Sequence, residues 1–294
     1  PVARCAEEGI VVFNTPGANA NGVKELAICA MLLAARDIVG GVNWARSLAG
    51  TADVAKQVEA GKSQFGGTEL RGKTLGVIGL GAIGGLVANA AVKLGMTVIG
   101  CDPYLSVAGA WNLDHHIVKA ATYEEVYAAA DYITLHVPAT ETTTGMINAQ
   151  TIAAMKKGVK IINLARAELV KAADLAVALE SGAVSAYVTD FPTEETVAIP
   201  QVVVIPHLGG STEEAEENCA VMAADELDEY IRYGNIQNSV NYPAANMPVA
   251  ASSRVCVLHA NIPAVLANIS SVMAKDGINI ENMLNKSKGE NAVS

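Results

Sequence analysis

The sequence predicts an α/β fold built on a doubly wound parallel sheet, and three observations lead to this prediction. Short and almost wholly apolar segments such as Thr74–Ile78 (TLGVI) have the length and composition of buried strands. Stretches of helix-forming residues such as Ala82–Leu94 separate these segments. A glycine-rich turn follows Thr74–Ile78 directly, which is typical of the first strand–turn–helix crossover in such sheets.

Three segments precede the region of the sheet. Gly9–Asn14 (GIVVFN) is apolar and bounded by turn residues, so we expect a buried strand there. Thr15–Asn21 is rich in Pro, Gly and Asn, which favours a loop. Val23–Val39 has the length and the residue types of a helix. The polar stretch Ser47–Lys73 then leads to the first strand of the sheet.

Strands and helices are expected to alternate through the sheet region. The predicted strands are Thr74–Ile78, Thr97–Cys101, Tyr132–Val137, Lys160–Leu164, Ala186–Thr189 and Val202–Ile205. The predicted helices are Ala82–Leu94, Tyr123–Ala129, Thr151–Met155 and Ala172–Ser181. Because the strands are apolar along their whole length, we expect helices to cover both faces of the sheet.

The last third of the chain changes character. Glu213–Tyr233 is expected to form a long helix, since its acidic first turn suits the helix dipole. Asn238–Val249 is rich in Asn and Pro, which is typical of a linker. A strand at Arg254–Ala260 and a helix at Pro263–Lys275 follow. This last unit is short for an independent domain, so we expect it to be the front part of one.

Composition excludes several classes of protein. The chain of 294 residues carries a net charge of −10, which disfavours general nucleic-acid binding. No run of 18 apolar residues is free of charge, so we expect no membrane span. The five cysteines are scattered without a CxxC pair, which fits a reducing, cytoplasmic compartment. No set of His, Cys, Asp and Glu has convincing metal-ligand spacing, and we expect no metal.

The glycine motif Gly79–Gly84 (GLGAIG) predicts a Rossmann-type dinucleotide site. Gly79 permits the tight turn, Gly81 lets the backbone approach a pyrophosphate, and Gly84 lets the helix pack close to the strand. Asp102 ends the next strand, where an acid binds ribose hydroxyls and repels a 2′-phosphate, which favours NAD over NADP. The alternative is a glycine-rich turn that binds nothing, or another nucleotide.

Three polar side chains follow three different predicted strands and form a candidate catalytic set. Reducing a 2-keto acid requires a general acid, a cation that holds the carboxylate, and a group that tunes the acid. His207, Arg166 and Glu194 have these chemistries at the edge where ligands bind in such sheets. Taken singly, they are more often a capping histidine, a surface ion-pair partner and a solvated acid. Of the other histidines, His115 and His116 are expected at the surface.

These motifs resemble the D-isomer-specific 2-hydroxyacid dehydrogenases from Gly9 to about Tyr242. The similarity lies in GLGAIG with Asp102, LHVPATETTTGMIN, NLAR, DFPTE and PHLGGSTEEAEEN. The resemblance implies that His207 is the acid/base, Glu194 its partner, and Arg166 the clamp for the substrate carboxylate and carbonyl. Departures from the family pattern are Ala167 after the arginine, Lys171, and DF in place of a DVF triplet.

The resemblance also implies the residues that contact NAD and the substrate. Contacts with NAD are expected from Gly79, Gly81, Ala82, Ile83, Gly84, Asp102, His136, Pro138, Leu164, Ala165, Arg166, Asp190, His207, Gly209 and Gly210. Contacts with a small 2-hydroxy or 2-keto acid are expected from Asn19, Arg166 and His207.

Within the family, FNTPGANANGVKELA is similar to the phosphoglycerate dehydrogenases, and the tail from Arg254 is similar to the opening of an ACT domain. This implies a remnant of a flavodoxin-like substrate domain with a crossover helix (1–45), an NAD-binding Rossmann domain (46–206), a return segment (207–243) and a partial α+β ACT domain (253–294). We therefore expect the first segment of the substrate domain and the end of the ACT domain to be missing.

The resemblance implies NAD-dependent oxidation of D-3-phosphoglycerate, the first step of L-serine biosynthesis. It also implies a homodimer or homotetramer, with L-serine as an effector at the ACT domain. Two alternatives remain. One is a reductase for glyoxylate, hydroxypyruvate or a D-lactate-type keto acid, and the other is a non-catalytic NAD-sensing interaction protein on the same fold.

Overall fold

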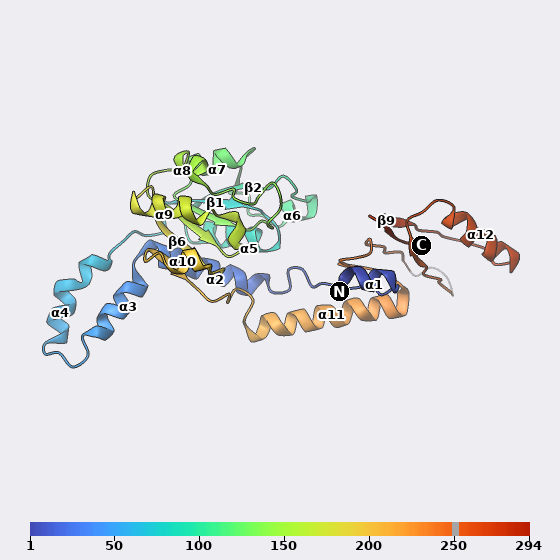
Figure 1. Ribbon diagram of the computed structural model, residues 1–294, viewed down its shortest axis with the longest axis horizontal. Helices are drawn as coiled ribbons and strands as arrows, with labels where there is room; N and C mark the ends of the chain where they lie inside the picture. The colour runs from blue at the N-terminus through green and yellow to red at the C-terminus, as the bar shows by residue number, and fades with distance from the viewer. Residues whose placement is uncertain (249–252) are drawn as a thin grey trace. The chain divides into compact units, whose positions relative to one another are not determined.

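The computed structural model describes residues 1–248 and 253–294 (Figure 1). The chain divides into two compact units, Asn19–Ala215 and Pro1–Ala18 with Glu216–Ser294. No helix in the described part of the chain combines the length and the apolar character that crossing a bilayer requires.

A seven-stranded sheet forms the centre of the unit Asn19–Ala215, in the order β3-β2-β1-β4-β5-β6-β7. Every neighbouring pair is parallel. The strands are β1 (Thr74–Ile78), β2 (Thr97–Cys101), β3 (Val118–Lys119), β4 (Tyr132–Leu135), β5 (Val159–Asn163), β6 (Val184–Thr189) and β7 (Val202–Val204). The order reverses between β1 and β4, so the predicted Rossmann-type parallel sheet is confirmed, with its ligand edge at this switch point.

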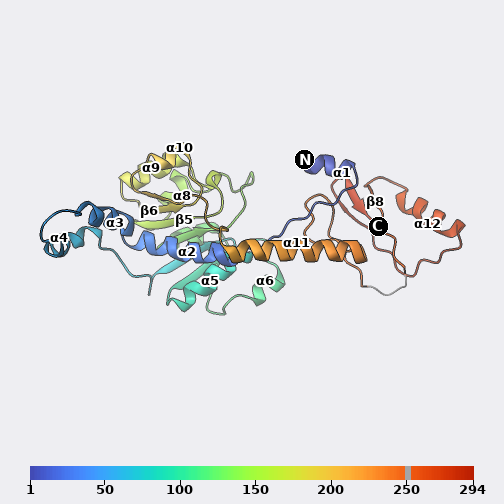
Figure 2. The ribbon, with the colours of Figure 1, turned by 90° about the horizontal axis from the view of Figure 1, so that it is seen from below.

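Helices cover both faces of this sheet (Figures 1 and 2). One face carries α2 (Ala20–Ala35) and α5 (Ala82–Lys93), and the other carries α7 (Tyr123–Ala129), α8 (Ala149–Ala153) and α9 (Ala172–Glu180). The shorter helices are α6 (Val107–Trp111), η2 (Ala167–Leu169) and α10 (Glu194–Val197).

The two faces are packed by alternate residues of the same strands. Leu75 and Val77 of β1 are fully buried in the cluster that contains Met31 of α2. Ile78 is buried in the other cluster, with Val126 of α7. Because side chains alternate across a strand, a wholly apolar strand must be covered on both sides.

The predicted helix Val23–Val39 is wrong at its end, because α2 stops at Ala35. Arg36 is extended, and the side chain of Asp37 accepts a hydrogen bond of 2.9 Å from the N–H of Gly40. Asp37 therefore caps a separate helix, α3 (Ile38–Ser47). An N-cap residue within an apolar helical pattern was the available sequence signal.

The polar stretch after α3 contains two elements that the sequence analysis missed, α4 (Val54–Gly61) and the 3₁₀ helix η1 (Lys62–Phe65). With α3 they form an arm, residues 38–65, that leads away from the sheet (Figure 1). The rings of Trp44 and Phe65 lie 5.3 Å apart and join α3 to η1. The arm therefore has a small apolar contact of its own.

The second unit contains α1 (Val2–Glu7), most of α11 (Glu213–Tyr233), α12 (Val265–Lys275) and an antiparallel sheet. That sheet has the order β8-β10-β9, with β8 (Leu258–Ala260), β9 (Lys286–Lys288) and β10 (Asn291–Val293). The predicted strand Arg254–Ala260 is thus confirmed only over its last three residues.

The predicted strand Gly9–Asn14 is wrong. Phe13 makes one isolated bridge to Ser239, with backbone hydrogen bonds from Asn14 N to Asn238 O (3.1 Å) and from Val240 N to Val12 O (2.9 Å), and a side chain holds the residues before it. The amide of Asn241 donates to Ile10 O (2.8 Å), and its carbonyl oxygen accepts from Val12 N (2.9 Å). An asparagine far along the chain therefore completes the pairing of this segment, which local sequence could not reveal.

The predicted linker Asn238–Val249 is also wrong over its described part, 238–248. Tyr242 and Ala245 are buried with Ile236 and Val293, and the Tyr242 hydroxyl donates to Ala6 O at 3.1 Å. The stretch therefore belongs to the core of its unit. Val249 lies outside the described residues.

Candidate active site

The turn after β1 requires glycine at two positions. Gly79 has φ +89°, and a Cβ there would lie 2.5 Å from the carbonyl oxygen of His136. A Cβ on Gly84 would lie 1.9 Å from the carbonyl oxygen of Gly79. The turn is thus packed too closely for any side chain at these positions.

Gly81 differs from these two glycines, because no described atom lies within 4 Å of the position of its missing Cβ. It is the N-cap of α5 and makes no side-chain cap, and the first intrahelical bond runs from Gly85 N to Gly81 O (2.9 Å). The N–H groups of Ala82, Ile83 and Gly84 therefore precede the helix ladder. An open space before a helix N-terminus suits an anionic group such as a pyrophosphate.

Asp102 links the end of β2 to this turn. Its two carboxylate oxygens accept hydrogen bonds from Leu80 N (2.9 Å) and Tyr104 N (2.8 Å). Each oxygen keeps a further lone pair, so the acid can still accept from ribose hydroxyls. The structure thus places Asp102 beside the glycine turn, as the motif predicts.

His136 and Pro138 follow β4 on the other side of the turn. The Nε2 atom of His136 lies 2.9 Å from the Thr134 hydroxyl, and burial lowers the pKa of this histidine to about 4. It is therefore neutral at neutral pH and unsuited to proton transfer. Thr143 donates to the carbonyl of Pro138 at 2.5 Å, which closes the following loop.

Arg166 and His207 contact the same aromatic ring. The His207 ring lies 4.5 Å from the ring of Phe191, and the Arg166 guanidinium lies 5.3 Å from it. Both polar side chains are exposed. An exposed cation and an imidazole thus lie around one side chain after β5, β6 and β7, as a 2-keto acid site requires.

Asp190 holds the turn that carries the histidine. Its backbone carbonyl accepts from His207 N at 3.0 Å, and its Oδ2 accepts from Gly209 N at 3.1 Å. His207 has φ +48°, a conformation that is uncommon for residues other than glycine. These bonds support the unusual backbone at the candidate acid/base.

The other oxygen of Asp190 is a buried acceptor. The residue is 1% exposed, and its Oδ1 has no hydrogen-bond partner among the described residues. Burial raises the pKa of this carboxyl, and it outweighs the Gly209 N–H and the nearby charges of His207 and Arg166. A buried oxygen without a partner is a place where a ligand donor would be stabilised.

Glu194 is not joined to His207. It is the first residue of α10, is exposed, and makes no hydrogen bond or ion pair with His207 in the described part of the chain. The acid that the structure does bring to the histidine is Asp190. The role of Glu194 as the partner of His207 stays a prediction.

Asn19 lies against the same turn. It is the N-cap residue of α2, and its Nδ2 is 2.7 Å from the position that a Cβ on Gly210 would occupy. A Cβ on Gly22 would lie 3.1 Å from the carbonyl oxygen of Gly209. The predicted substrate residue Asn19 is therefore beside the histidine turn.

Asn163 and Phe191 are site residues that the sequence analysis did not single out. Asn163 is fully buried at the end of β5, where it donates to Arg166 O (2.8 Å) and accepts from Ala165 N (3.2 Å). It thereby shapes the loop of Leu164, Ala165 and Arg166. A buried asparagine that ends an apolar strand was the available signal.

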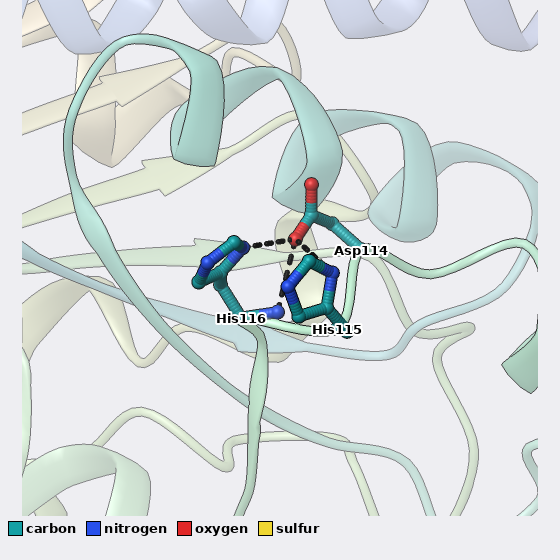
Figure 3. Close-up of side chains that lie close together, drawn as sticks. All are labelled: Asp114, His115 and His116. Atoms are coloured by element: carbon teal, nitrogen blue, oxygen red, sulfur yellow. Dashed lines mark hydrogen bonds and ion pairs between the residues drawn. The ribbon is translucent and has the colours of Figure 1, made fainter.

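Asp114, His115 and His116 lie close together at the surface (Figure 3). Asp114 Oδ1 lies 2.8 Å from Nδ1 of His116 and accepts from the His116 N–H at 2.9 Å. These bonds lower the pKa of Asp114. The cluster lies within three consecutive exposed or half-exposed residues, and the expectation of no metal stays a prediction.

We expect Asp190→Asn to stabilise the protein at neutral pH. The pKa of the Asp190 carboxyl is raised in the folded protein. The protonated carboxyl therefore contributes to the stability of the fold at low pH, and this contribution is lost as the pH rises through the folded pKa. Asparagine removes the charge and keeps an acceptor for Gly209 N–H. The expected gain is about 1 kcal/mol at pH 7, a usual scale for one substitution, and it should vanish below about pH 4.

Urea midpoints of the variant and the parent at the two pH values check this. Asp225→Asn, at an exposed acid of α11, is the matched control. A less stable Asp190→Asn protein at pH 7 would contradict the account of this site.

Comparison with known families matches residues 30–209 to the model of the D-isomer specific 2-hydroxyacid dehydrogenase, NAD binding domain. This segment contains the glycine turn, Asp102, Arg166, Asp190 and His207. It covers more than half of the chain.

Named relatives extend the match. The D-3-phosphoglycerate dehydrogenase of Methanocaldococcus jannaschii is 38% identical over 253 residues, which is 84% of this chain and 46% of that protein. That of Bacillus subtilis is 35% identical over 83% of this chain and 45% of its own length. D-3-phosphoglycerate dehydrogenase 1 of Saccharomyces cerevisiae is 32% identical over 96% of this chain and 62% of that protein. The chain thus spans about half to three fifths of the length of these relatives.

Solved structures with the same architecture include a glyoxylate reductase from Paecilomyes thermophila. Its TM-score is 0.68 and its identity 27%, with 81% of this chain and 70% of that chain covered. The apo D-mandelate dehydrogenase of Rhodotorula graminis has a TM-score of 0.70 at 24% identity, over 80% and 69% of the two chains. The second likeness concerns the fold alone.

Proposed function

Because the chain belongs to the D-isomer-specific 2-hydroxyacid dehydrogenase family, we propose that it oxidises D-3-phosphoglycerate to 3-phosphohydroxypyruvate with NAD. The observation that carries the catalytic part is the contact of Arg166 and His207 with one ring, Phe191. The substrate is proposed from relatives of that name that are 32–38% identical.

The residues of this chain fit NAD, the cofactor of the family's domain. The open space at Gly81 and the N–H groups of Ala82 to Gly84 suit the pyrophosphate, and Asp102 suits the adenosine ribose. The buried Oδ1 of Asp190 suits an amide N–H of the nicotinamide. The loop of Leu164 and Ala165, the turn of Gly209 and Gly210, and residues His136 and Pro138 complete the proposed contacts.

The chemistry of this chain's residues follows from their charges. NAD, when bound, accepts the hydride from C2 of the substrate. The imidazole of His207 takes the proton from the C2 hydroxyl as the C–H bond breaks, and returns it in the reverse direction. The Arg166 guanidinium holds the carboxylate and polarises the C2 oxygen, and Asn19 orients the substrate beside the turn. Glu194 is proposed to reach His207 in the loaded enzyme.

The substrate experiment follows the absorbance of NADH with 3-phosphohydroxypyruvate, hydroxypyruvate and glyoxylate. A higher kcat/KM for the phosphorylated keto acid would support the proposal. Preference for glyoxylate or hydroxypyruvate would favour the reductase alternative, for which the P. thermophila structure is the argument. Tight NADH binding without any turnover would favour an NAD-sensing protein and would contradict the catalytic roles.

We further propose that the chain forms a homodimer through the arm of residues 38–65. Ile38, Val39 and Val42 of α3 are each more than 40% exposed, although they are apolar. A cluster of exposed aliphatic side chains on a projecting element is typical of an interface. A homotetramer would need a further contact.

We expect Val42→Glu to dissociate this dimer. A charge in the centre of an apolar contact loses its hydration without gaining a partner, which costs at least a few kcal/mol. Light scattering after size exclusion should show a monomer. Val177→Glu, on an equally apolar exposed position of α9, is the control and should leave the mass unchanged. A dimer that survives Val42→Glu would contradict the arm as the interface.

Residues 253–294 form a strand, a helix and a hairpin. We propose that residues 253–294 belong to an ACT domain, and the order of β8, α12, β9 and β10 (a strand, a helix and a hairpin) supports this proposal. L-serine is its proposed effector and the cytoplasm the proposed location. The domain limits 1–45, 46–206 and 207–243 are proposed in the same way.

A further inference from the structure

The edge of the sheet opposite the glycine turn contains a cavity lined by lysines. The cavity has a volume of about 150 Å³ and includes Lys73, Lys156, Lys157 and Lys160. Lys73 directly precedes β1, and Lys156 and Lys157 precede β5, whereas Gly79 follows the other end of β1. Since β1, β4 and β5 are adjacent and parallel, these lysines converge at the amino edge.

One acid is present in this cavity, and its hydrogen bonds are already made. Asp131 Oδ2 accepts from Thr74 N (2.8 Å), and Oδ1 accepts from Lys156 Nζ (3.0 Å). Burial alone would raise the pKa of Asp131, but these bonds and the lysines nearby lower it. Asp131 is therefore a carboxylate whose two oxygens are already bonded, one to the N–H of Thr74 and one to Lys156.

The other three lysines make no ion pair in the described part of the chain. Lys73 and Lys160 are half-buried. The Lys160 ammonium lies 5.1 Å from the ring of Tyr132, which supports it from one side. Burial lowers the pKa of Lys160, and the charge of Lys73 lowers it further. In a chain of net charge −10, this cavity brings four lysines together with one acid, so its described residues carry an excess of positive charge.

We propose that this lysine cavity binds a phosphate-class oxyanion, as inorganic phosphate or as the phosphate group of a monoester. Ammonium groups on several sides of a small cavity bind such an ion by charge-assisted hydrogen bonds. The volume of 150 Å³ equals about five water molecules, which accommodates one tetrahedral oxyanion with some solvent. Pockets for larger ligands have volumes from about 300 Å³, so a dinucleotide is excluded here.

The site is separate from the proposed catalytic centre. The residues that line it precede the strands or begin them, and most of those of the proposed NAD site follow the strands. Thr68 also lines the cavity, and its hydroxyl lies 3.5 Å from that of Tyr132. Thr68 lies between the arm of residues 38–65 and β1, so an ion bound here contacts the connection to the arm.

The test is calorimetric titration of the full chain with inorganic phosphate, at constant ionic strength and with saturating NAD, which fills the glycine-turn site. Lys73→Gln and Lys160→Gln are each expected to weaken the affinity about tenfold, which corresponds to about 1.4 kcal/mol. Lys93→Gln, at an exposed lysine in the last turn of α5, removes the same charge outside the cavity and should change it less than about twofold.

A second measurement does not depend on the folding of variants. Mass spectrometry after brief lysine acylation should show that phosphate protects Lys73 and Lys160 and leaves Lys93 reactive. Glycerol phosphate in place of inorganic phosphate shows whether a monoester is also accepted. No heat of binding, binding that both cavity variants retain, or equal protection of all three lysines would overturn the proposal. NAD binding and turnover are measured separately, so the two proposals fail independently.

Discussion

Replacing His207 with alanine is expected to lower the kcat of keto-acid reduction by about 10³-fold, within the usual range for loss of a general acid. The imidazole is exposed and contacts Phe191, whereas His136 is half-buried with its pKa lowered to about 4, and the Arg166 guanidinium does not give up its proton. The acid that remains at this turn is Asp190, which is 1% exposed and accepts a hydrogen bond from Gly209 N, so it is not expected to replace the imidazole. Affinity for NADH should stay within about fivefold, since the glycine turn is untouched and the loss is confined to one ring contact.

Steady-state assays with NADH and 3-phosphohydroxypyruvate, together with fluorescence titration of NADH, separate the two effects. The matched control is His116→Ala, which removes an imidazole from an exposed position outside the site. In the parent, kcat/KM for keto-acid reduction should fall on the side of the pH profile where the His207 imidazole has lost its proton. This fall should be absent in the variant. An unchanged kcat in His207→Ala would show that another group carries the proton.

Two glycine variants should separate cofactor binding from folding. Gly81→Ala adds a methyl group where the protein has open space, so stability should change by less than about 0.5 kcal/mol. NADH affinity should nevertheless fall by about 100-fold, because the methyl group occupies the space of the pyrophosphate. Gly84→Ala meets the Gly79 carbonyl at 1.9 Å, so both stability and affinity should fall.

Gly85→Ala is the control in the same helix turn. Its nearest neighbour is the flexible Leu113 side chain at 3.3 Å, and alanine favours the helix over glycine by about 1 kcal/mol. Thermal melts and NADH titrations of the three variants provide the measurement. If Gly81→Ala binds NADH as well as the parent, the dinucleotide does not approach the backbone at this turn.

The sequence by itself determined the class of fold and the position of the cofactor turn. Apolar strands of the right length leave few arrangements other than a covered parallel sheet, as β1, β4 and β5 confirm. Gly84 could be assigned because its constraint is local, between the turn and its own helix, whereas Gly79 is constrained both by its φ of +89° and by the distant carbonyl of His136. Arg166 and His207 could be proposed because strand ends meet at one edge of such a sheet.

Only the tertiary structure decided which groups meet across the sheet and between distant segments. Asp190 rather than Glu194 contacts the His207 turn, because Asp190 directly follows the buried strand β6, whereas Glu194 is the exposed first residue of α10. The side chain of Asn241 holds Ile10 and Val12. The lysine cavity brings Lys73 together with Lys160 and its neighbours. Such contacts arise between residues far apart along the chain. Periodicity and turn signals report only on neighbours within a few residues, so they predict elements and leave partners undetermined.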